Sequence, residues 1–136
     1  MEIQELFIGA LVNFLRYVDG TTIEEPHRVT GIMSYNETWC IQTDASDSYY
    51  DIDSFAPIGV TDDIMAHSGF ILDLGSATYR LTGNRWLEYR FKDSMLIEWW
   101  NNGQVGLEII SQCPCRCTHQ LQAALRLCGS EIEITL

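Results

Sequence analysis

Basic residues are scarce in this sequence. Eight Lys and Arg stand against nineteen Asp and Glu among 136 residues, which gives a net charge of −11. Nucleic-acid affinity rests mainly on Lys and Arg that neutralise phosphates, and anionic membrane surfaces repel an acidic protein. The composition therefore argues against direct binding to nucleic acid or to a membrane. The charge favours a basic partner or serves only to keep the protein soluble, and solubility is the commoner reason for such a charge.

Long apolar runs are also missing. No segment approaches the ~20 apolar residues of a membrane helix, and the acidic start from Met1 to Glu5 is unlike a signal peptide. We therefore predict a cytoplasmic protein, in which the thiols stay reduced. The odd number of cysteines, five, also argues against a disulfide framework.

Common catalytic and metal-binding motifs are absent as well. The sequence contains no phosphate-binding glycine loop, no G-x-S-x-G elbow and no H-E-x-x-H helix. The alternating aspartates of residues 44–54 resemble a calcium loop, but an EF-hand that starts at Asp47 needs Gly at its sixth and Glu at its twelfth position. Ile52 and Ile58 stand there. We interpret residues 44–54 as a solvated acidic loop and predict that the protein is not an enzyme.

The hydrophobic pattern predicts an α+β protein with two lobes. Residues 1–60 are predicted to form an SH3-like small β-barrel of five strands, with a hairpin turn at Asp19-Gly20, because both residues tolerate positive φ, and a second turn at Asn36-Glu37. Four of its strands are predicted over 6–18, 27–33, 38–43 and around Phe55, and Gly9 is a candidate bulge in the first of them.

Residues 61–136 are predicted to form a short helix, an antiparallel β-meander and a C-terminal helix that packs on it, with the two lobes alternatively forming one continuous domain. The first helix spans 62–68, with Thr61 as its N-cap and Gly69 at its end. Four strands are predicted over 79–81, 86–91, 95–100 and 105–110, with a turn at Lys92-Asp93-Ser94 between the second and the third. A helix over 118–128 and a final strand over 131–135 are predicted to follow.

Two local details of the second lobe are predicted from spacing. The Asn102-Gly103 turn would pair Trp100 with Val105 and Trp99 with Gly106, so that the Trp99 ring covers the glycine. Thr118 is the expected N-cap of the last helix. The expected apolar stripe of this helix is Leu121, Ala124, Leu125 and Cys128, and its expected polar face is His119, Gln122 and Arg126.

Three sequence patches carry a family resemblance. They run from Glu5 to Val12 with Arg28 to Ile32, from Phe55 to Met65 with Ser68 to Phe70, and from His119 to Gln122 with Leu127 to Ile134. Together they resemble a family of small uncharacterised proteins encoded by gut-type bacteria and their phages and mobile elements. The resemblance implies a bacterial or phage source and no known activity, so it assigns no catalytic residue. The cysteine-rich stretch before His119 is not a feature of that family.

The most unusual cluster in the sequence is Cys113-Pro114-Cys115-Arg116-Cys117-Thr118-His119. Three thiols and an imidazole are a ligand set that Zn²⁺ accepts. In an extended segment, however, the thiols spread over roughly 13 Å at ~3.3 Å per residue. Small buried thiols are therefore the first interpretation, a zinc site is the alternative, and a Cys117/His119 nucleophile pair is a weaker one.

Trp99 and Trp100 are adjacent on a predicted strand, so their side chains point to opposite faces. One of them is expected to cover a second layer or a partner surface. With no catalytic set in view, we expect a non-enzymatic protein-interaction module without a cofactor, and a homo-oligomer is compatible with this expectation. The alternatives are a zinc-stabilised domain and an acidic inhibitor that mimics nucleic acid and blocks a basic host protein.

Overall fold

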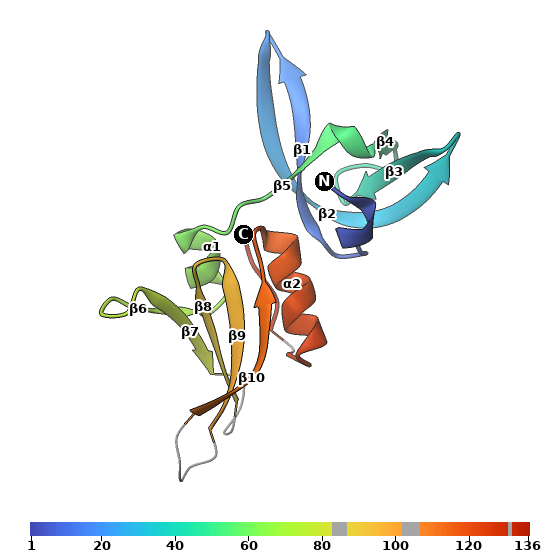
Figure 1. The fold of residues 1–136 in the computed structure, drawn as a ribbon. Helices are drawn as coiled ribbons and strands as arrows, with labels where there is room; N and C mark the ends of the chain where they lie inside the picture. Colours follow the sequence, from blue (N-terminus) through green and yellow to red (C-terminus); the bar gives the residue numbers. More distant parts are fainter. Residues whose placement is uncertain (83–86, 102–106, 131) are drawn as a thin grey trace. The chain divides into compact units, whose positions relative to one another are not determined.

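The structure of the chain is a computed structural model that describes residues 1–82, 87–101, 107–130 and 132–136, and for 82, 99–101 and 107–111 it describes the backbone. The chain divides into an N-terminal unit, Met1–Ile58, and a C-terminal unit, Gly59–Leu136. Each unit contains one five-stranded antiparallel sheet (Figure 1). The predicted antiparallel α+β class is confirmed.

The sheet of the N-terminal unit is open. Its strand order is β4-β3-β2-β1-β5, so that β4 and β5 are its two edges and the strands do not close. The SH3-like barrel is therefore not confirmed. The elements of this unit are η1 (Ile3–Glu5), β1 (Leu11–Val18), β2 (Thr21–Tyr35), β3 (Thr38–Thr43), β4 (Tyr49–Asp51), η2 (Ile52–Ser54) and β5 (Phe55–Pro57).

Two hairpin turns of the N-terminal unit are confirmed. Asp19 and Gly20 have φ of 50° and 79°, and Asn36 and Glu37 have φ of 49° and 63°. Consecutive positive φ angles match the right-handed twist of the strands that each turn connects. The two hairpins hold a core of buried apolar side chains, which are Leu6, Ala10, Val12, Val29, Ile41 and Phe55.

Two predictions in this unit are wrong. The strand predicted over 6–18 begins only at Leu11, because Gly9 adopts φ of 96° and its N–H donates to the Val29 carbonyl at 2.8 Å. The apolar run before Leu11 therefore turns into the core. The loop predicted over 44–54 contains a strand, β4, and a helical turn, η2. The Asp51 side chain accepts a hydrogen bond from the Asp53 N–H and starts that turn.

Strand β2 is longer than predicted and serves two hairpins. Residues 21–28 pair with β1, and β3 pairs from Val29 onward (Figure 1). The backbone N–H and carbonyl of Arg28 both bond Asp44, on the side away from β1. By the two-residue period of a strand, the nitrogen of Pro26 points to that same side. In the described part of the chain no strand pairs with Pro26 on that side, so the missing N–H of proline costs no ladder hydrogen bond there.

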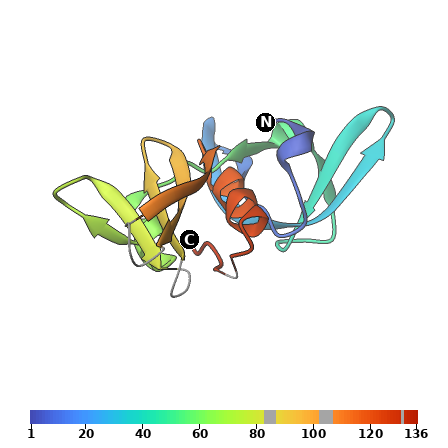
Figure 2. The same ribbon diagram turned by 60° about the horizontal axis from the view of Figure 1, so that its bottom comes forward.

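The sheet of the C-terminal unit is a meander of five strands, one more than predicted, in the order β10-β9-β8-β7-β6. Asp93 and Ser94 have φ of 51° and 59°, which confirms the predicted turn between β8 and β9. Helix α2 lies beside β10 (Figures 1 and 2). The elements are α1 (Asp62–His67), β6 (Ile71–Asp73), β7 (Thr78–Thr82), β8 (Leu87–Lys92), β9 (Met95–Asn101), β10 (Leu107–Pro114) and α2 (Thr118–Leu127).

The first predicted helix is confirmed as α1. The Thr61 side chain accepts a hydrogen bond from the Ile64 N–H at 3.2 Å, and Gly69 ends the helix with φ of 94°. The strand predicted over 131–135 is wrong for its described part, since residues 132–136 form no strand. This tail is held to α1 instead, because the Thr135 N–H donates to the Ser68 hydroxyl at 2.9 Å.

Helix α2 corrects two predictions. Its N-cap is Cys117, and Thr118 is its first residue, with a hydroxyl that donates to the Gly59 carbonyl at 3.3 Å. The stripe of Leu121, Ala124 and Leu125 is buried as predicted. His119 and Gln122 were placed on a polar outer face, but they are 0% and 6% exposed. The helix is therefore buried on more than one face.

The strand pairing beyond β9 also differs from prediction. Trp99 pairs with Ile109 and Trp100 with Glu108, not with Gly106 and Val105. The described pair nearest the predicted Asn102-Gly103 turn is Asn101 with Leu107. That turn lies outside the described residues.

Candidate interaction surface

Negative charge is concentrated in the N-terminal unit. This unit holds two arginines and ten carboxylates, a net charge of −8, which leaves −3 for the C-terminal unit. Its field is therefore strongly negative at close range, and this field attracts cationic partners.

The exposed aromatic side chains lie in the same unit. Among the described residues, every aromatic side chain that is classed as exposed belongs to the N-terminal unit, and the set is Tyr17, Tyr35, Trp39, Tyr49 and Tyr50. Exposed large apolar groups that gather in one region are typical of an interaction surface. The C-terminal unit exposes aliphatic side chains instead, with Ile71, Leu72 and Leu74 in or beside the edge strand β6.

Strand alternation sorts these aromatics onto two faces of the sheet. Ile41 is fully buried and pairs with Tyr50, which therefore lies on the core side. Trp39 stands two residues before Ile41 and shares that side. Tyr49 is adjacent to Tyr50 in the chain and equally exposed, at 42%, but it lies on the opposite face.

On the core side, rings from four segments come together. The Phe14 ring centroid lies 4.8 Å from that of Tyr50, 5.4 Å from Phe55 and 6.2 Å from His27, all in tilted arrangements. Tilted pairs at these distances are favourable because ring edges face ring π-clouds. We call this surface the aromatic face, which consists of Phe14, His27, Trp39, Tyr50 and Phe55.

Carboxylates border the aromatic face. Glu25 lies 2.7 Å from the Arg16 guanidinium and 3.4 Å from His27 Nε2. The hydrogen bond from Arg16 is the main reason why the pKa of Glu25 lies below its usual value, so this carboxylate stays ionised at neutral pH. Asp44 Oδ1 lies 3.8 Å from His27 Nδ1, and the Asp44 side chain is 57% exposed. The surface thus combines π-faces with negative charge.

The opposite face contains an aromatic ring over a glycine. A Cβ built on Gly31 would come within 2.5 Å of the Tyr49 hydroxyl and 2.9 Å of Gln42 Oε1. Tyr49 and Gln42 therefore cover the bare backbone of Gly31. This device was predicted for Trp99 over Gly106, and the structure has it in the other unit. The side chains of Trp99 and Trp100, the predicted interface residues, lie outside the described part.

The cysteine and histidine cluster is only partly assembled. Cys117 Sγ lies 3.5 Å from both His119 Nδ1 and His119 Nε2. Cys115 is buried with its thiol near the Cys113 carbonyl, at 3.5 Å, and Cys113 is half-buried. Across the described residues, no three His, Cys, Asp or Glu side chains are grouped so that they could hold a metal ion.

The geometry of this cluster does not suit thiol chemistry. A sulfur that is equally distant from both ring nitrogens is not aligned with either one, whereas a nucleophile and its base need one directed hydrogen bond. Burial raises the pKa of Cys115 to about 12, with the neighbouring Cys113 adding to the shift. Its reactive thiolate is therefore not populated at neutral pH.

Sequence reasoning missed a buried polar pair in the C-terminal unit. Glu98 is 8% exposed and pairs across the sheet with Tyr89, which is 2% exposed. Burial, and then the negative charge of Glu98, raises the pKa of Tyr89, and the Tyr89 hydroxyl also bonds Ser130 just beyond α2. Period-2 alternation from Leu96, which is buried, would have placed Glu98 on the inner face.

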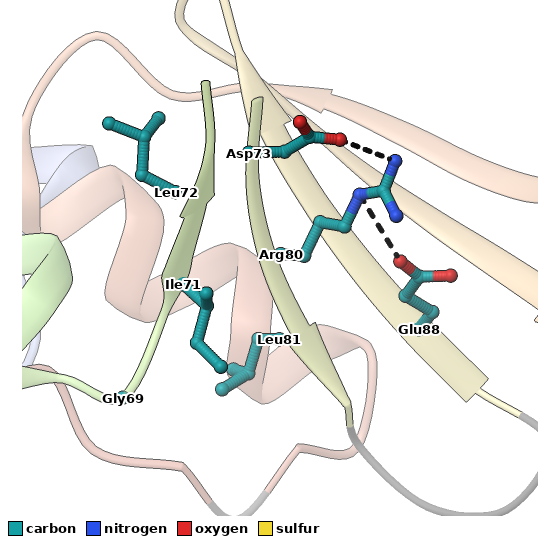
Figure 3. A pocket seen from close by; sticks show the side chains of 7 residues that line it. All are labelled: Gly69, Ile71, Leu72, Asp73, Arg80, Leu81 and Glu88. Atoms are coloured by element: carbon teal, nitrogen blue, oxygen red, sulfur yellow. Dashed lines mark ion pairs between the residues drawn. The ribbon is translucent and has the colours of Figure 1, made fainter. Parts of the chain in front are cut away.

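A shallow hollow of about 640 Å³ lies at the β6 end of this sheet (Figure 3). Arg80 lies between two carboxylates there, 2.9 Å from Asp73 and 3.8 Å from Glu88, with Ile71 and Leu81 beside them. Both acids neutralise the guanidinium, and the hydrogen bond from the Gly75 N–H keeps the pKa of Asp73 below its usual value. The group ties three strands together, because Asp73, Arg80 and Glu88 come from β6, β7 and β8.

Comparison with models of protein families, with curated proteins and with solved structures gives no match. Among the described residues, no helix is long and apolar enough to cross a membrane.

Proposed function

We propose that the chain is a non-enzymatic protein-interaction module of phage or mobile-element origin, and that its N-terminal unit carries the interaction. The observation that carries the proposal is the coincidence of five exposed aromatic rings and a charge of −8 in the N-terminal unit of 58 residues. Exposed Tyr and Trp provide large contact areas at low entropic cost. The proposed origin rests on the resemblance of three sequence patches to phage-related proteins.

The arrangement of strands supports a finer proposal for this unit. A five-stranded antiparallel sheet with two hairpins suits an SH3-like lobe in which β4 and β5 form the two edges. In the C-terminal unit, residue types that often act in catalysis make contacts that hold the fold together. Arg80 joins strands, Glu98 meets Tyr89, and Cys115 is a buried thiol of raised pKa. These contacts favour a binding role over catalysis.

Affinity capture with the full chain tests the proposal. The wild type and a Trp39→Ala/Tyr50→Leu variant are immobilised and exposed to bacterial lysate at two salt concentrations, and retained proteins are identified by mass spectrometry. We expect basic proteins on the wild type that are lost at high salt and lost with the variant. A Leu74→Ala/Leu127→Ala control removes two side chains of the C-terminal unit that are each 85% exposed. Equal capture by all three proteins, or none by the wild type, contradicts the proposal.

The charge distribution favours one second candidate, an acidic inhibitor that mimics nucleic acid. Ten carboxylates on 58 residues give a high density of negative groups, and a DNA-binding partner would meet them with its phosphate-binding Lys and Arg. Duplex DNA added to the capture experiment separates the two candidates. Release of the partner by DNA favours the mimic, and retention of the partner favours an interaction surface of its own.

A further inference from the structure

The aromatic face has the chemistry of a guanidinium site. A planar guanidinium stacks on aromatic rings and also pairs with carboxylates. Tyr50 offers a ring that is 42% exposed and is held from behind by Phe14 at 4.8 Å. Trp39, 43% exposed, lies diagonally beside it on the same face.

The carboxylates at the border complete this chemistry. The chain already holds one guanidinium there, because Arg16 bonds Glu25 at 2.7 Å. Asp44 follows β3 and reaches the same group of rings through His27, to which its Oδ1 is 3.8 Å distant. With its side chain 57% exposed, Asp44 is the more accessible of the two acids. Charge complementarity therefore selects a cationic occupant and disfavours a neutral or acidic one.

We infer that Tyr50, with Asp44 and Glu25 at the border of its ring cluster and Trp39 diagonally beside it, binds an arginine side chain of a basic, extended segment of the partner protein. This inference rests on the proposed function and narrows it to one kind of partner. The short edge strand β4, whose three residues are all exposed, leaves the approach to Tyr50 open.

Tyr49 supplies a matched control for Tyr50. The two residues are neighbours in β4, have the same side chain and the same 42% exposure, and lie on opposite faces. Tyr50→Leu keeps an apolar side chain against Phe14 and removes the π-face. Tyr50→Phe keeps the ring. Tyr49→Leu makes the same change as Tyr50→Leu on the face that lacks the site.

The experiment measures fluorescence anisotropy of the full chain with a labelled Arg-Gly-Ser repeat peptide, and with the same peptide in which Gln replaces Arg. We expect saturable binding of the arginine peptide that weakens about fivefold in Tyr50→Leu, in line with typical cation–π energies. Tyr50→Phe and Tyr49→Leu should stay within about twofold of the wild type. Asp44→Asn should weaken binding and flatten its salt dependence. Thermal melts establish that each variant is folded.

Each outcome has a distinct meaning. If the arginine peptide does not bind, or if Tyr49→Leu weakens it as much as Tyr50→Leu, the guanidinium site is overturned. If the glutamine peptide binds equally well and still depends on Tyr50, the partner chemistry is wrong while the interaction module stands. Loss of aromatic-dependent capture from lysate, tested separately, is the result that overturns the proposed function itself.

Discussion

In the N-terminal unit five aromatic side chains are exposed and most of the negative charge is carried at the surface, whereas in the C-terminal unit Tyr89, Phe91, His119 and Glu98 are all buried. Each unit is built on a five-stranded antiparallel sheet. The difference between them lies in where the aromatic and polar groups are placed. A sheet that keeps them inside gains packing and internal hydrogen bonds, and one that leaves them outside keeps them available for another molecule.

The largest loss of stability is expected from a substitution in the buried core of the C-terminal unit, in helix α2. Leu121 is fully buried and Leu127, in the same helix, is 85% exposed. Leu121→Ala should lower the free energy of unfolding by about 3 kcal/mol, through lost burial and a residual cavity. Leu127→Ala should leave it within about 0.5 kcal/mol of the wild type. Urea denaturation measures both, and equal effects of the two substitutions would show that α2 is packed differently.

Alkaline pH should cause the next largest loss in the free energy of unfolding, and this loss should arise mainly in the C-terminal unit. Because burial raises the pKa of Cys115 from 9 to about 12, its contribution to stability is complete below pH 9 and is lost as pH rises toward 12. We expect the loss to be on the order of 2 kcal/mol.

Urea denaturation at pH 8, 9, 10 and 11 measures how steeply the free energy of unfolding falls with pH. The Cys115→Ala variant should show a shallower fall. A slope that is unchanged by this substitution contradicts the assignment. Tyr79, whose pKa is raised to about 12 chiefly by its hydrogen bond to Asp62, contributes equally to both proteins.

Removing one hydroxyl compares a buried tyrosine with an exposed one. Tyr89→Phe removes the hydroxyl that bonds Glu98 and Ser130 and leaves a buried carboxylate with one partner fewer. The free energy of unfolding should fall by about 1.5 kcal/mol. Tyr17, 77% exposed in the N-terminal unit, should tolerate the same change with no measurable effect. A neutral Tyr89→Phe would mean that its hydroxyl contributes nothing to the fold.

Alanine substitutions at two glycines should have smaller and unequal effects on the free energy of unfolding. Gly69→Ala places a side chain at φ of 94° and should cost about 1 kcal/mol. Gly31→Ala forces only the ends of two side chains, Tyr49 and Gln42, to move, so we expect a loss of about 0.5 kcal/mol. Thermal melts rank them, and a larger cost at Gly31 would show that the Tyr49 ring is fixed in place.

The smallest effect is expected from metal removal. The geometry of Cys113, Cys115, Cys117 and His119 does not gather three ligands, so dialysis against EDTA should leave the melting temperature unchanged. Elemental analysis of protein purified without chelator is the direct measurement. One equivalent of zinc, together with destabilisation by EDTA, would instead support the zinc-stabilised alternative.

Local chemistry explains which parts of the fold were predictable. The turns at Asp19-Gly20, Asn36-Glu37 and Asp93-Ser94, and the Thr61 cap, depend on backbone preferences of two to four adjacent residues. The start of β1 was predicted too early because an apolar run looks the same whether it continues as a strand or turns into a core. Only the distant Val29 carbonyl decides between them.

The candidate surface was less predictable than the fold. His119 was assigned to solvent because helical spacing shows one apolar stripe, and burial of a second face of α2 depends on packing that spacing does not encode. Tyr50 and Trp39 lie eleven residues apart and share a face only through the β3–β4 pairing. That pairing fell in a segment whose aspartates suggested a loop.

Pro26 has a consequence for how the long β1–β2 hairpin behaves in a crowded cell. Its nitrogen points to the side of β2 where none of the described strands pairs with residues 21–28. If a second chain extended the sheet from that side, its carbonyl oxygen would find no backbone N–H donor at this position, which makes fibre-like stacking unfavourable. Replacing this residue with one that carries an amide hydrogen would remove a built-in safeguard against aggregation.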